Sequence, residues 1–402
     1  MIAAVQPCSL CGCVDAPPSK SMAHRYLIGA ALSGEVCTLS GVDFSEDILA
    51  SMDCLRALGA DVTSHGDRVT VDPRGFMKAE QPVLECRESG STLRFFIPLA
   101  LCLGRTVILR GSRRLLERPL DVYEELCREG GFRFEKSGDG ITLCGDLKGG
   151  HYTVRGDISS QFITGLMLAL LYRGEDSSIE ILPPFESRSY VELTVSALRS
   201  FGACVSFAGK HRIEIRPSVL HGFSGRIEGD YSNAAFLDAF NHLGSSVRIG
   251  NLNPESLQGD RVYSAYFDAI SRGTPTLDIS DCPDLGPVLF ALAALKNGAT
   301  FTGTDRLKAK ESDRGAAMDE ELRKLGGGLI FGHNSITVPR GNLLYRGVRL
   351  NGHNDHRIVM ALSVILSQTG GSIDGAEAIR KSYPGFFEDI IGLGAEVELY
   401  DR

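Results

Sequence analysis

One pattern recurs along the chain: an amphipathic helical stretch that ends in glycine, followed by two short alternating segments around a polar turn. The glycines that end the six copies are Gly59, Gly130, Gly202, Gly244, Gly326 and Gly394. Their spacings are 71, 72, 42, 82 and 68 residues, so most copies fit a unit of about 70 residues and one is displaced. Glycine readily adopts the left-handed conformation that ends a helix, and apolar alternation indicates strands. Each copy therefore predicts a helix, a glycine cap and a β-hairpin.

The repeats predict an α/β protein with two domains of three units each. A chain of 402 residues is long enough for two domains. In the first three copies, the second hairpin strand is expected at 68–72, 140–144 and 212–216. The stretch 287–295 is almost entirely apolar, and a helix that is apolar all round is buried. We therefore expect some helices to lie inside their domain.

The net charge and the hydropathy pattern narrow the choice of partners. Lys and Arg number 42 against 50 Asp and Glu, a formal charge of −8, which disfavours sequence-independent binding to nucleic acid or an anionic membrane. Apolar runs such as 95–103 stop well short of the roughly 20 residues that cross a bilayer. The first residues have neither signal-peptide nor transit-peptide character. We expect a cytoplasmic monomer with no nucleic-acid or membrane partner.

Two clusters of metal-ligand residue types deserve comparison with known metal sites. Cys8, Cys11 and Cys13 form a C-x-x-C-x-C string, but no second closely spaced cysteine pair completes it. We interpret these cysteines as packed thiols in an N-terminal strand, since free cysteine behaves as a small buried hydrophobe. His353 and His356 lie beside Arg357, which favours anion binding. No metal and no cofactor is expected.

Three predicted helices begin with hydroxyl-rich segments, at residues 17–25, 88–94 and 156–164. A helix N-terminus with a Ser or Thr cap favours anions. The first segment is not a Walker loop, because the Gly-rich approach to Lys20-Ser21 is missing. Simple N-capping explains any one of the three, but not the accompanying Lys20, Arg94 and Gln161. Together they predict a site for a multiply charged anion.

The C-terminal half adds segments that mix cations with isolated carboxylates, at 281–284, 308–314, 352–357 and 380–384. Cations can hold phosphate groups, while a carboxylate among them can exchange a proton. The mixture is what acid–base chemistry on a phosphorylated substrate needs.

These motifs, in this order, resemble the EPSP synthase (3-phosphoshikimate 1-carboxyvinyltransferase) family over about residues 20–385. The motifs are Pro18-Ser-Lys-Ser21 with Arg25, Gly90 with Arg94, Arg118-Pro119, Ser159-Ser160-Gln161, Lys310-Glu311 with Arg314, Asn354-Asp355-His356-Arg357, and Lys381. The resemblance implies two inside-out α/β barrels of the enolpyruvyl transferase type, built from six βαβαββ units, three per domain. It also implies one domain formed by 1–12 and 228–402, an inserted domain at 13–227, and an active site in the cleft between them.

The resemblance implies that the enolpyruvyl group of phosphoenolpyruvate is transferred to the 5-hydroxyl of shikimate 3-phosphate, as in the pathway to chorismate and the aromatic amino acids. The residues that would bind shikimate 3-phosphate are Lys20, Ser21, Arg25, Ser159, Ser160, Gln161, Ser187, Asp284 and Lys310, with Tyr190 as a wall. Those that would bind phosphoenolpyruvate are Lys20, Gly90, Arg118, Gln161, Arg314, Arg357 and Lys381. Asp284 would take the hydroxyl proton, and Glu311 with Lys20 would handle the methylene proton.

Two departures from the family pattern concern the substrate contacts. Arg306 stands where relatives commonly have Asn, so that contact is not carried over, and Ser91 and Thr92 differ from the commonest residues after the glycine. Gly90 is the residue that in the family leaves room for the inhibitor glyphosate, and we therefore expect sensitivity.

Other functions compete with this interpretation. UDP-N-acetylglucosamine enolpyruvyl transferase has a similar fold but carries Lys-Asn where this chain has Lys20-Ser21, and it uses a loop cysteine as its acid. A non-catalytic binder of phosphorylated ligands would not need Asp284 and Glu311 among its cations. An RNA-end enzyme on a related repeat fold is disfavoured by the acidic charge balance.

Overall fold

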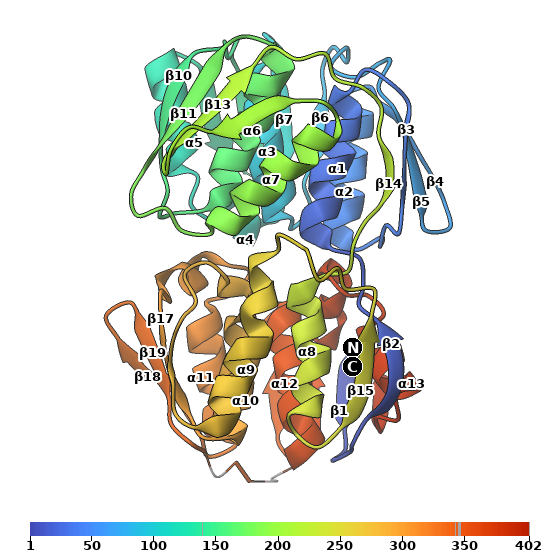
Figure 1. Cartoon of the computed structure of the whole chain (residues 1–402), viewed down its shortest axis with the longest axis vertical. Helices are drawn as coiled ribbons and strands as arrows, with labels where there is room; N and C mark the ends of the chain where they lie inside the picture. The colour runs from blue at the N-terminus through green and yellow to red at the C-terminus, as the bar shows by residue number, and fades with distance from the viewer. Residues whose placement is uncertain (139, 342, 345–346, 402) are drawn as a thin grey trace. The chain divides into compact units, whose positions relative to one another are not determined.

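The computed structural model describes residues 1–138, 140–341, 343–344 and 347–401. The chain divides into two compact units (Figure 1). The terminal unit comprises Met1–Pro17 and Gly229–Arg402, and the central unit comprises Pro18–Glu228. Each unit is an α/β structure with its own hydrophobic core. The terminal unit thus draws on both ends of the sequence.

The central unit contains three βαβαββ repeats, each with one four-stranded mixed sheet. In each sheet the first two strands are parallel, and the second pairs with an antiparallel hairpin. The first repeat comprises β14 (Ser224–Arg226), α1 (Lys20–Leu32), β3 (Cys37–Ser40), α2 (Glu46–Ala57), β4 (Asp61–His65) and β5 (Arg68–Asp72). The second comprises β6 (Val83–Glu85), α3 (Gly90–Leu101), β7 (Val107–Arg110), α4 (Arg113–Leu116), α5 (Asp121–Gly130), β8 (Arg133–Ser137) and β9 (Gly140–Cys144). The third comprises β10 (His151–Arg155), α6 (Ser160–Arg173), β11 (Ser177–Leu182), α7 (Arg188–Ser200), β12 (Cys204–Phe207) and β13 (Arg212–Arg216).

The terminal unit contains the other three repeats, of which the first is shortened. That repeat comprises β2 (Cys11–Asp15), α8 (Tyr231–Asn241), β15 (Ser246–Gly250), η1 (Gly259–Val262) and α9 (Tyr263–Arg272). The next comprises β16 (Thr276–Asp278), η2 (Pro283–Leu285), α10 (Gly286–Leu295), β17 (Ala299–Thr302), η3 (Asp305–Ala309), α11 (Arg314–Lys324), β18 (Ile330–Gly332) and β19 (Ser335–Val338). The last comprises β20 (Arg349–Asn351), α12 (His356–Thr369), β21 (Gly371–Asp374), η4 (Ala376–Lys381), α13 (Phe386–Gly392), β22 (Val397–Tyr400) and, from the other end of the sequence, β1 (Ile2–Val5).

The displaced copy of the sequence pattern corresponds to the shortened repeat. Among the described residues, its sheet has the order β15-β2 with two parallel strands, whereas the last two repeats have the four-stranded orders β16-β17-β19-β18 and β20-β21-β1-β22. The helix α9 stands where the other repeats have a helix followed by a hairpin. The spacing before Gly244 is short because this glycine follows α8, the first helix of its repeat, whereas the other five glycines mark the end of the last helix of theirs.

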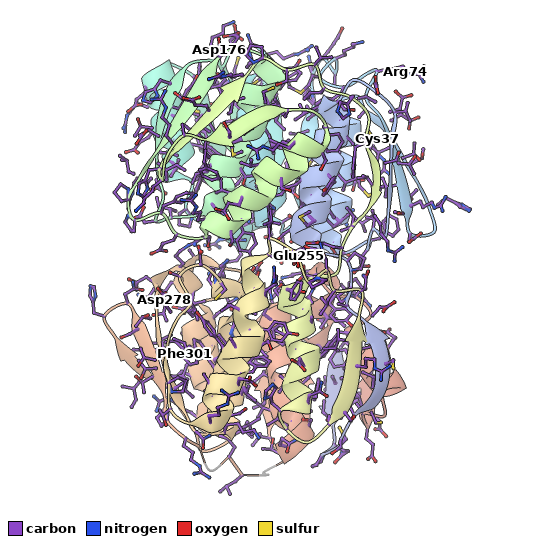
Figure 2. All side chains as sticks on the ribbon, viewed as in Figure 1. Cys37, Arg74, Asp176, Glu255, Asp278 and Phe301 are labelled. Carbon is purple, nitrogen blue, oxygen red and sulfur yellow. The ribbon has the colours of Figure 1, made fainter. Side chains whose placement is uncertain are left out.

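Each unit buries one helix per repeat at its centre. In the central unit these are α1, α3 and α6, and nearly all residues of α3 and α6 are buried. In the terminal unit they are α8, α10 and α12, and α10 is buried from Gly286 to Ala294. Cys37 on β3 and Phe301 on β17 also lie in the cores, whereas Arg74 extends into solvent (Figure 2). The expected buried apolar helix is confirmed.

The glycine caps follow the sequence prediction with one change of position. Gly59, Gly202, Gly244, Gly326 and Gly394 all have φ between 85° and 102°. In the remaining copy α5 includes Gly130, and the left-handed cap with φ 66° is Gly131. The expected strands at 68–72, 140–144 and 212–216 are β5, β9 and β13.

The packed-thiol interpretation is wrong for two of the three N-terminal cysteines. Cys11 and Cys13 lie on β2 with exposed side chains, and Cys8 is half-buried. Side chains alternate along a strand, so Cys11 and Cys13 share one face of β2, and that face is exposed. The described helices include none long and apolar enough to span a bilayer.

Candidate functional site

In the central unit, the three buried helices start in the same way. Ser19, Ser89 and Ser159 are the N-caps of α1, α3 and α6, and each side-chain oxygen accepts a hydrogen bond from a backbone N–H of the first turn. The first turns, 20–23, 90–93 and 160–163, contain no Asp or Glu. Neutral caps leave the positive ends of the helix dipoles uncompensated by a carboxylate. These helix starts are therefore suited to anions.

The amide of Gln161 is held between two of these helix starts. Its Oε1 accepts from Nη1 of Arg94 at 2.8 Å, and its Nε2 donates to Oγ of Ser91 at 2.8 Å. Arg94 also donates to the carbonyl of Pro119 at 3.1 Å, and its guanidinium stacks over the ring of Phe162. The contacts fix the orientation of the amide and join the start of α6 to that of α3.

Lys20, the first residue of α1, forms an ion pair that the sequence did not indicate. Its Nζ lies 2.9 Å from Oδ2 of Asp47, a nearly buried carboxylate on α2. The hydroxyl of Thr92 donates to the carbonyl of Asp47 at 3.3 Å. Fully buried His24 lies on the same helix as Lys20; burial, with repulsion from Lys20 and Arg25, holds the pKa of His24 well below its ordinary value. A neutral imidazole therefore lies behind the ammonium group.

Arg25 and Ser187 occupy constrained positions near α7. The guanidinium of Arg25 donates to Oγ1 of Thr194 at 2.8 Å and to the carbonyls of Ser21 and Tyr190 at 2.6 and 2.9 Å. Burial lowers the pKa of Arg25 to about 10. Ser187, buried at the N-terminus of α7, has φ 51°, a conformation that is uncommon for serine and often found at functional sites.

In the terminal unit, Asp284 accepts contacts from three cations. Oδ1 lies 2.9 Å from Nζ of Lys310 and 2.7 Å from Nη1 of Arg314, and Oδ2 lies 3.2 Å from Nη2 of Arg357. Burial alone would raise the pKa of Asp284, but these three cations hold it well below its ordinary value. Asp284 is therefore ionised at neutral pH.

Arg314 links this carboxylate to two others. Its fully buried guanidinium also donates to Oε2 of Glu311 at 2.7 Å and, through Nε, to Oδ2 of Asp355 at 2.9 Å. Burial alone would lower the pKa of Arg314, but the carboxylates of Asp355, Glu311 and Asp284 raise it above the ordinary arginine value. The guanidinium is thus a fixed positive charge with a fixed plane.

Arg357 and Lys381 lie next to this network. Arg357 is in the first turn of α12, where its N–H donates to the capping carboxylate of Asp355 at 2.9 Å, and its Nη2 donates to Oγ of Ser232 at 2.9 Å. Nζ of Lys381 donates to the carbonyl of Asn354 at 2.6 Å. The structure therefore joins five of the predicted residues of the terminal unit in one network of contacts: Asp284, Lys310, Glu311, Arg314 and Arg357. The sixth, Lys381, binds the carbonyl of Asn354, the residue before Asp355 of that network.

Lys310 differs from the arginines because its charge is titratable. Burial lowers the pKa of its ammonium group to about 8, an effect that the nearby cations Arg314 and Arg306 reinforce and the carboxylate of Asp284 opposes. Arg306, the departure from the family pattern, is itself nearly buried on η3 and donates to the carbonyl of Ser280 at 3.4 Å. The cluster thus contains one lysine that can lose its charge near neutral pH.

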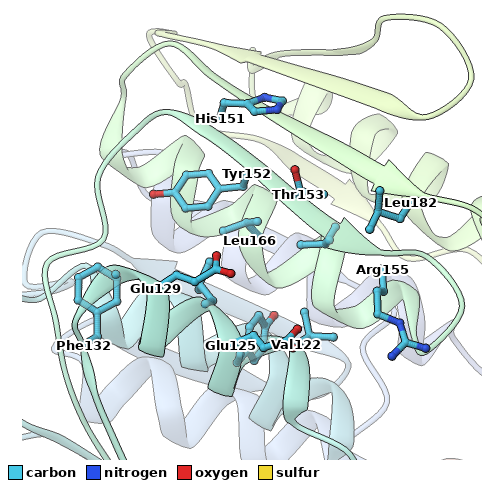
Figure 3. Close-up of a pocket in the computed structure, with 14 residues that line it drawn as sticks. Val122, Glu125, Glu129, Phe132, His151, Tyr152, Thr153, Arg155, Leu166 and Leu182 are labelled. Carbon is cyan, nitrogen blue, oxygen red and sulfur yellow. The ribbon is translucent and has the colours of Figure 1, made fainter.

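A cavity elsewhere in the central unit contains none of the predicted site residues. It measures about 500 Å³ and lies between α5 and β10, with walls that include Glu125, Glu129, Phe132, His151 and Arg155 (Figure 3). Its lining mixes exposed carboxylates and one arginine with apolar side chains, and has no group of converging cations. The cavity therefore does not resemble a site for phosphorylated ligands.

One trio of described residues has the composition of a metal site: Glu320, Glu321 and His353. The ammonium group of Lys324 lies 2.7 and 2.8 Å from the two carboxylate oxygens of Glu321. A cation from the chain itself therefore already binds the carboxylate that a metal would need.

Several residues in these networks were not assigned a role from the sequence. Asp47, Asp355 and Ser232 pair with predicted cations. Arg94 was expected as a cation of the anion site, and the structure shows that it orients the amide of Gln161. Asp355 lies within the Asn354-Asp355-His356-Arg357 motif, so the sequence could have pointed to it as a site residue. Asp47 and Ser232 lie in otherwise ordinary helical segments, where nothing in the sequence distinguishes them from surface or capping residues.

Comparison with known proteins gives consistent matches over nearly the whole chain. The family model described as EPSP synthase (3-phosphoshikimate 1-carboxyvinyltransferase) matches residues 5–390. The 3-phosphoshikimate 1-carboxyvinyltransferase of Clostridium kluyveri is 38% identical, covering 98% of this chain and 97% of the relative. That of Clostridium perfringens is 35% identical, covering 97% of both.

Solved structures share the fold. Two structures of EPSP synthase from Acinetobacter baumannii superpose with TM-scores of 0.79 and 0.80 at 21% and 20% identity. They cover 99% and 100% of this chain and the whole of each matched chain. The predicted fold class, an α/β protein built from repeated βαβαββ units, is confirmed, and among the described residues the repeat with β2 and β15 lacks the hairpin.

Proposed function

The chain belongs to the EPSP synthase family, and from that membership we propose that it transfers the carboxyvinyl group of phosphoenolpyruvate to the 5-hydroxyl of shikimate 3-phosphate and releases phosphate. The observation that carries the proposal is the position of Asp284, an ionised carboxylate among three cations and linked through Arg314 to Glu311. A reaction between two anionic substrates that also moves protons needs both features.

We assign the phosphate and hydroxyl groups of shikimate 3-phosphate to residues of both units. The helix starts at Ser159 and Ser160, together with Ser187, offer hydroxyls and backbone N–H groups that suit a phosphate. We propose that six further residues contact shikimate 3-phosphate: Lys20, Ser21, Arg25, Gln161, Asp284 and Lys310. The donor contacts of Arg25 to Thr194, Ser21 and Tyr190 give it a second role, since they also fix the start of α1 against α7.

We assign phosphoenolpyruvate to the cations that have fixed orientations. A guanidinium can offer two parallel N–H groups to a carboxylate or phosphate, and we assign that role to Arg357. Arg314, whose three nitrogens already bind carboxylates of the chain, contributes its positive charge. Lys381, Arg118 and Lys20 supply further positive charge, while Gly90 and Gln161 border the ligand.

The chemistry requires a proton donor for the enol methylene and an acceptor for the 5-hydroxyl. Protonation at the methylene makes C2 electrophilic, and the 5-hydroxyl oxygen attacks C2. The tetrahedral ketal phosphate then loses a proton from the new methyl group and expels phosphate, which restores the carbon–carbon double bond. Asp284 takes the hydroxyl proton, and Glu311 with Lys20 handles the methylene proton. When the anionic groups of phosphoenolpyruvate bind Arg314 and Arg357, these cations stabilise ionised Asp284 less, and its basicity rises.

One assay tests the proposal directly: phosphate release by the purified chain with shikimate 3-phosphate and phosphoenolpyruvate together. We expect release that depends on both substrates, and no release when UDP-N-acetylglucosamine replaces shikimate 3-phosphate. Release with the nucleotide sugar alone as acceptor would overturn the proposal. The cytoplasmic location and the monomeric state stay predictions, the second of which size-exclusion chromatography would check.

A further inference from the structure

Glu321 is a fully buried carboxylate that the proposed chemistry does not use. It lies on α11, seven residues after Arg314. Its Oε2 accepts from the backbone N–H of Asn351 at 2.9 Å, its Oε1 lies 2.7 Å from Nε2 of His353, and Lys324 binds both oxygens. Burial would raise the pKa of Glu321, but these partners lower it. The carboxylate is thus ionised and fully engaged.

The partners of Glu321 belong to an unusual loop. His353 and Asn354 have consecutive φ values of 49° and 50°, in the left-handed region that side-chain-bearing residues rarely occupy. A second contact braces the loop, because the N–H of His353 donates to Oδ1 of Asn351 at 2.8 Å. Two such residues in sequence persist only where surrounding contacts hold them. Glu321 supplies such contacts from the neighbouring helix.

This loop carries the cluster proposed to bind phosphoenolpyruvate. The carbonyl of Asn354 accepts from Nζ of Lys381 at 2.6 Å. The next residue, Asp355, accepts from Nε of Arg314 at 2.9 Å and from the N–H of Arg357 at 2.9 Å. A shift of the loop would therefore move Lys381, Arg314 and Arg357 together.

We propose that Glu321 is a positioning residue for phosphoenolpyruvate, which acts by holding the His353–Asn354 loop in its left-handed conformation. The inference rests on the proposed function. The proposal predicts different effects on the two substrates, because the cations that the loop orients are those assigned to phosphoenolpyruvate. Loss of the Glu321 contacts to the loop weakens the binding of phosphoenolpyruvate and leaves that of shikimate 3-phosphate nearly unchanged.

Steady-state kinetics of the Glu321→Gln variant test the proposal. Gln keeps the size of the side chain but replaces one acceptor oxygen by a donor, so it cannot accept all the contacts. We expect the KM for phosphoenolpyruvate to rise roughly tenfold and the KM for shikimate 3-phosphate to change less than about twofold. The matched control is Glu320→Gln, because Glu320 is adjacent on α11 but exposed, and its ion pair to Lys324 is long, at 3.5 Å. That variant should keep both KM values.

A second variant guards against a folding defect. His353→Asn removes the contact to Glu321 but keeps a residue type that tolerates the left-handed conformation. This variant should also raise the KM for phosphoenolpyruvate. The double variant should have a KM no higher than that of the more impaired single variant, because both substitutions remove the same contact between Glu321 and His353. If Glu321→Gln does not fold, the KM for phosphoenolpyruvate of His353→Asn tests the proposal instead, and an unchanged value would overturn it.

The outcomes separate this inference from the proposed function. A lowered melting temperature of Glu321→Gln with both KM values unchanged would mean a merely structural role and overturn the inference alone. An equal rise in both KM values would also overturn it. A wild-type chain and a Glu320→Gln control that release no phosphate from the two substrates would instead overturn the proposed function, and the inference with it.

Discussion

The guanidinium of Arg118 lies directly against the α-carbon of Gly90. A Cβ built on Gly90 would fall 2.6 Å from Nη1 and 2.8 Å from Cζ of Arg118. Real Cβ atoms essentially never come so close to another heavy atom, so any other residue at this position must push the guanidinium aside. Because Gly90 has no side chain, the Arg118 guanidinium can lie against the start of α3, where we propose that phosphoenolpyruvate binds.

Gly90→Ala is expected to displace Arg118 and raise the KM for phosphoenolpyruvate roughly tenfold, equivalent to about 1.4 kcal/mol of binding free energy. The fold should survive, because the displaced group is the far end of a flexible side chain. Steady-state kinetics and a thermal melt measure the two effects. Gly392→Ala is the control, because a Cβ there meets no atom within 4 Å. An unchanged KM would show that Arg118 does not contact this substrate.

Glyphosate is expected to inhibit the chain in competition with phosphoenolpyruvate. The resemblance to the family implies that a glycine at position 90 leaves room for the inhibitor, and the neighbouring cations suit its phosphonate and carboxylate groups. Initial rates at several inhibitor and phosphoenolpyruvate concentrations would reveal the competitive pattern. No inhibition at millimolar glyphosate would contradict the expectation.

Asp284→Asn should reduce kcat by about 10²- to 10⁴-fold, the usual range for loss of a general base. The amide keeps the shape of the carboxylate and can still accept hydrogen bonds, but it does not take up the hydroxyl proton. Isothermal calorimetry should show that shikimate 3-phosphate still binds. Asp281→Asn, three residues earlier on an exposed position, should keep full turnover. Unimpaired turnover of Asp284→Asn would remove Asp284 from the role of base.

The KM for shikimate 3-phosphate should rise as the pH increases through about 8. Below this pH Lys310 carries its charge, and above it the ammonium group, whose pKa burial lowers to about 8, becomes neutral. The loss of a charged hydrogen bond to the substrate should raise KM about tenfold or more. The profile of kcat/KM between pH 6 and 10 measures the effect, since it reports groups of the free enzyme. In Lys310→Arg the rise should disappear, because arginine stays charged.

Arg94→Lys should impair both substrates through Gln161. A single ammonium group does not reproduce the two separate contacts that Arg94 makes to Gln161 and to the carbonyl of Pro119. Both KM values are expected to rise about threefold to tenfold. The same change in a Gln161→Ala background should add little, because the shared contact is already lost. Additive effects in the double variant would mean that Arg94 acts independently of Gln161.

Much of the fold was predictable because each repeat is defined locally. Glycine caps, hairpin alternation and the apolar helix at 287–295 are short-range signals, and the structure has the elements at those places. Strand pairings between distant segments were not predictable. Strand β14 pairs with β3 although nearly 190 residues separate them, as in Ser224↔Thr38, and no local pattern encodes such a neighbour.

The site was predictable where residue types are unusual and not where they are common. Cations at helix starts, such as Lys20 and Arg357, could be recognised from the sequence because a cation at a helix N-terminus is suited to binding an anion. Asp47, the partner of Lys20, and Glu321, the partner of Lys324 and His353, are acidic residues on helices, where such residues are normally solvated. Their burial and their ion pairs arise only when helices pack, so the sequence alone gave no signal for them.

Strand β1 imposes an order on biosynthesis. It lies between β21 and β22, so Ile2 pairs with Asp374 and with Tyr400. On a ribosome that adds about 5–20 residues per second, the first strand waits roughly 20–80 seconds for these partners. Over that interval the central unit, a continuous segment, is complete and free to fold, while β1 has both edges exposed. The nascent chain thus carries an unpaired strand until its last repeat emerges, and that is the stage at which a chaperone would have most to protect.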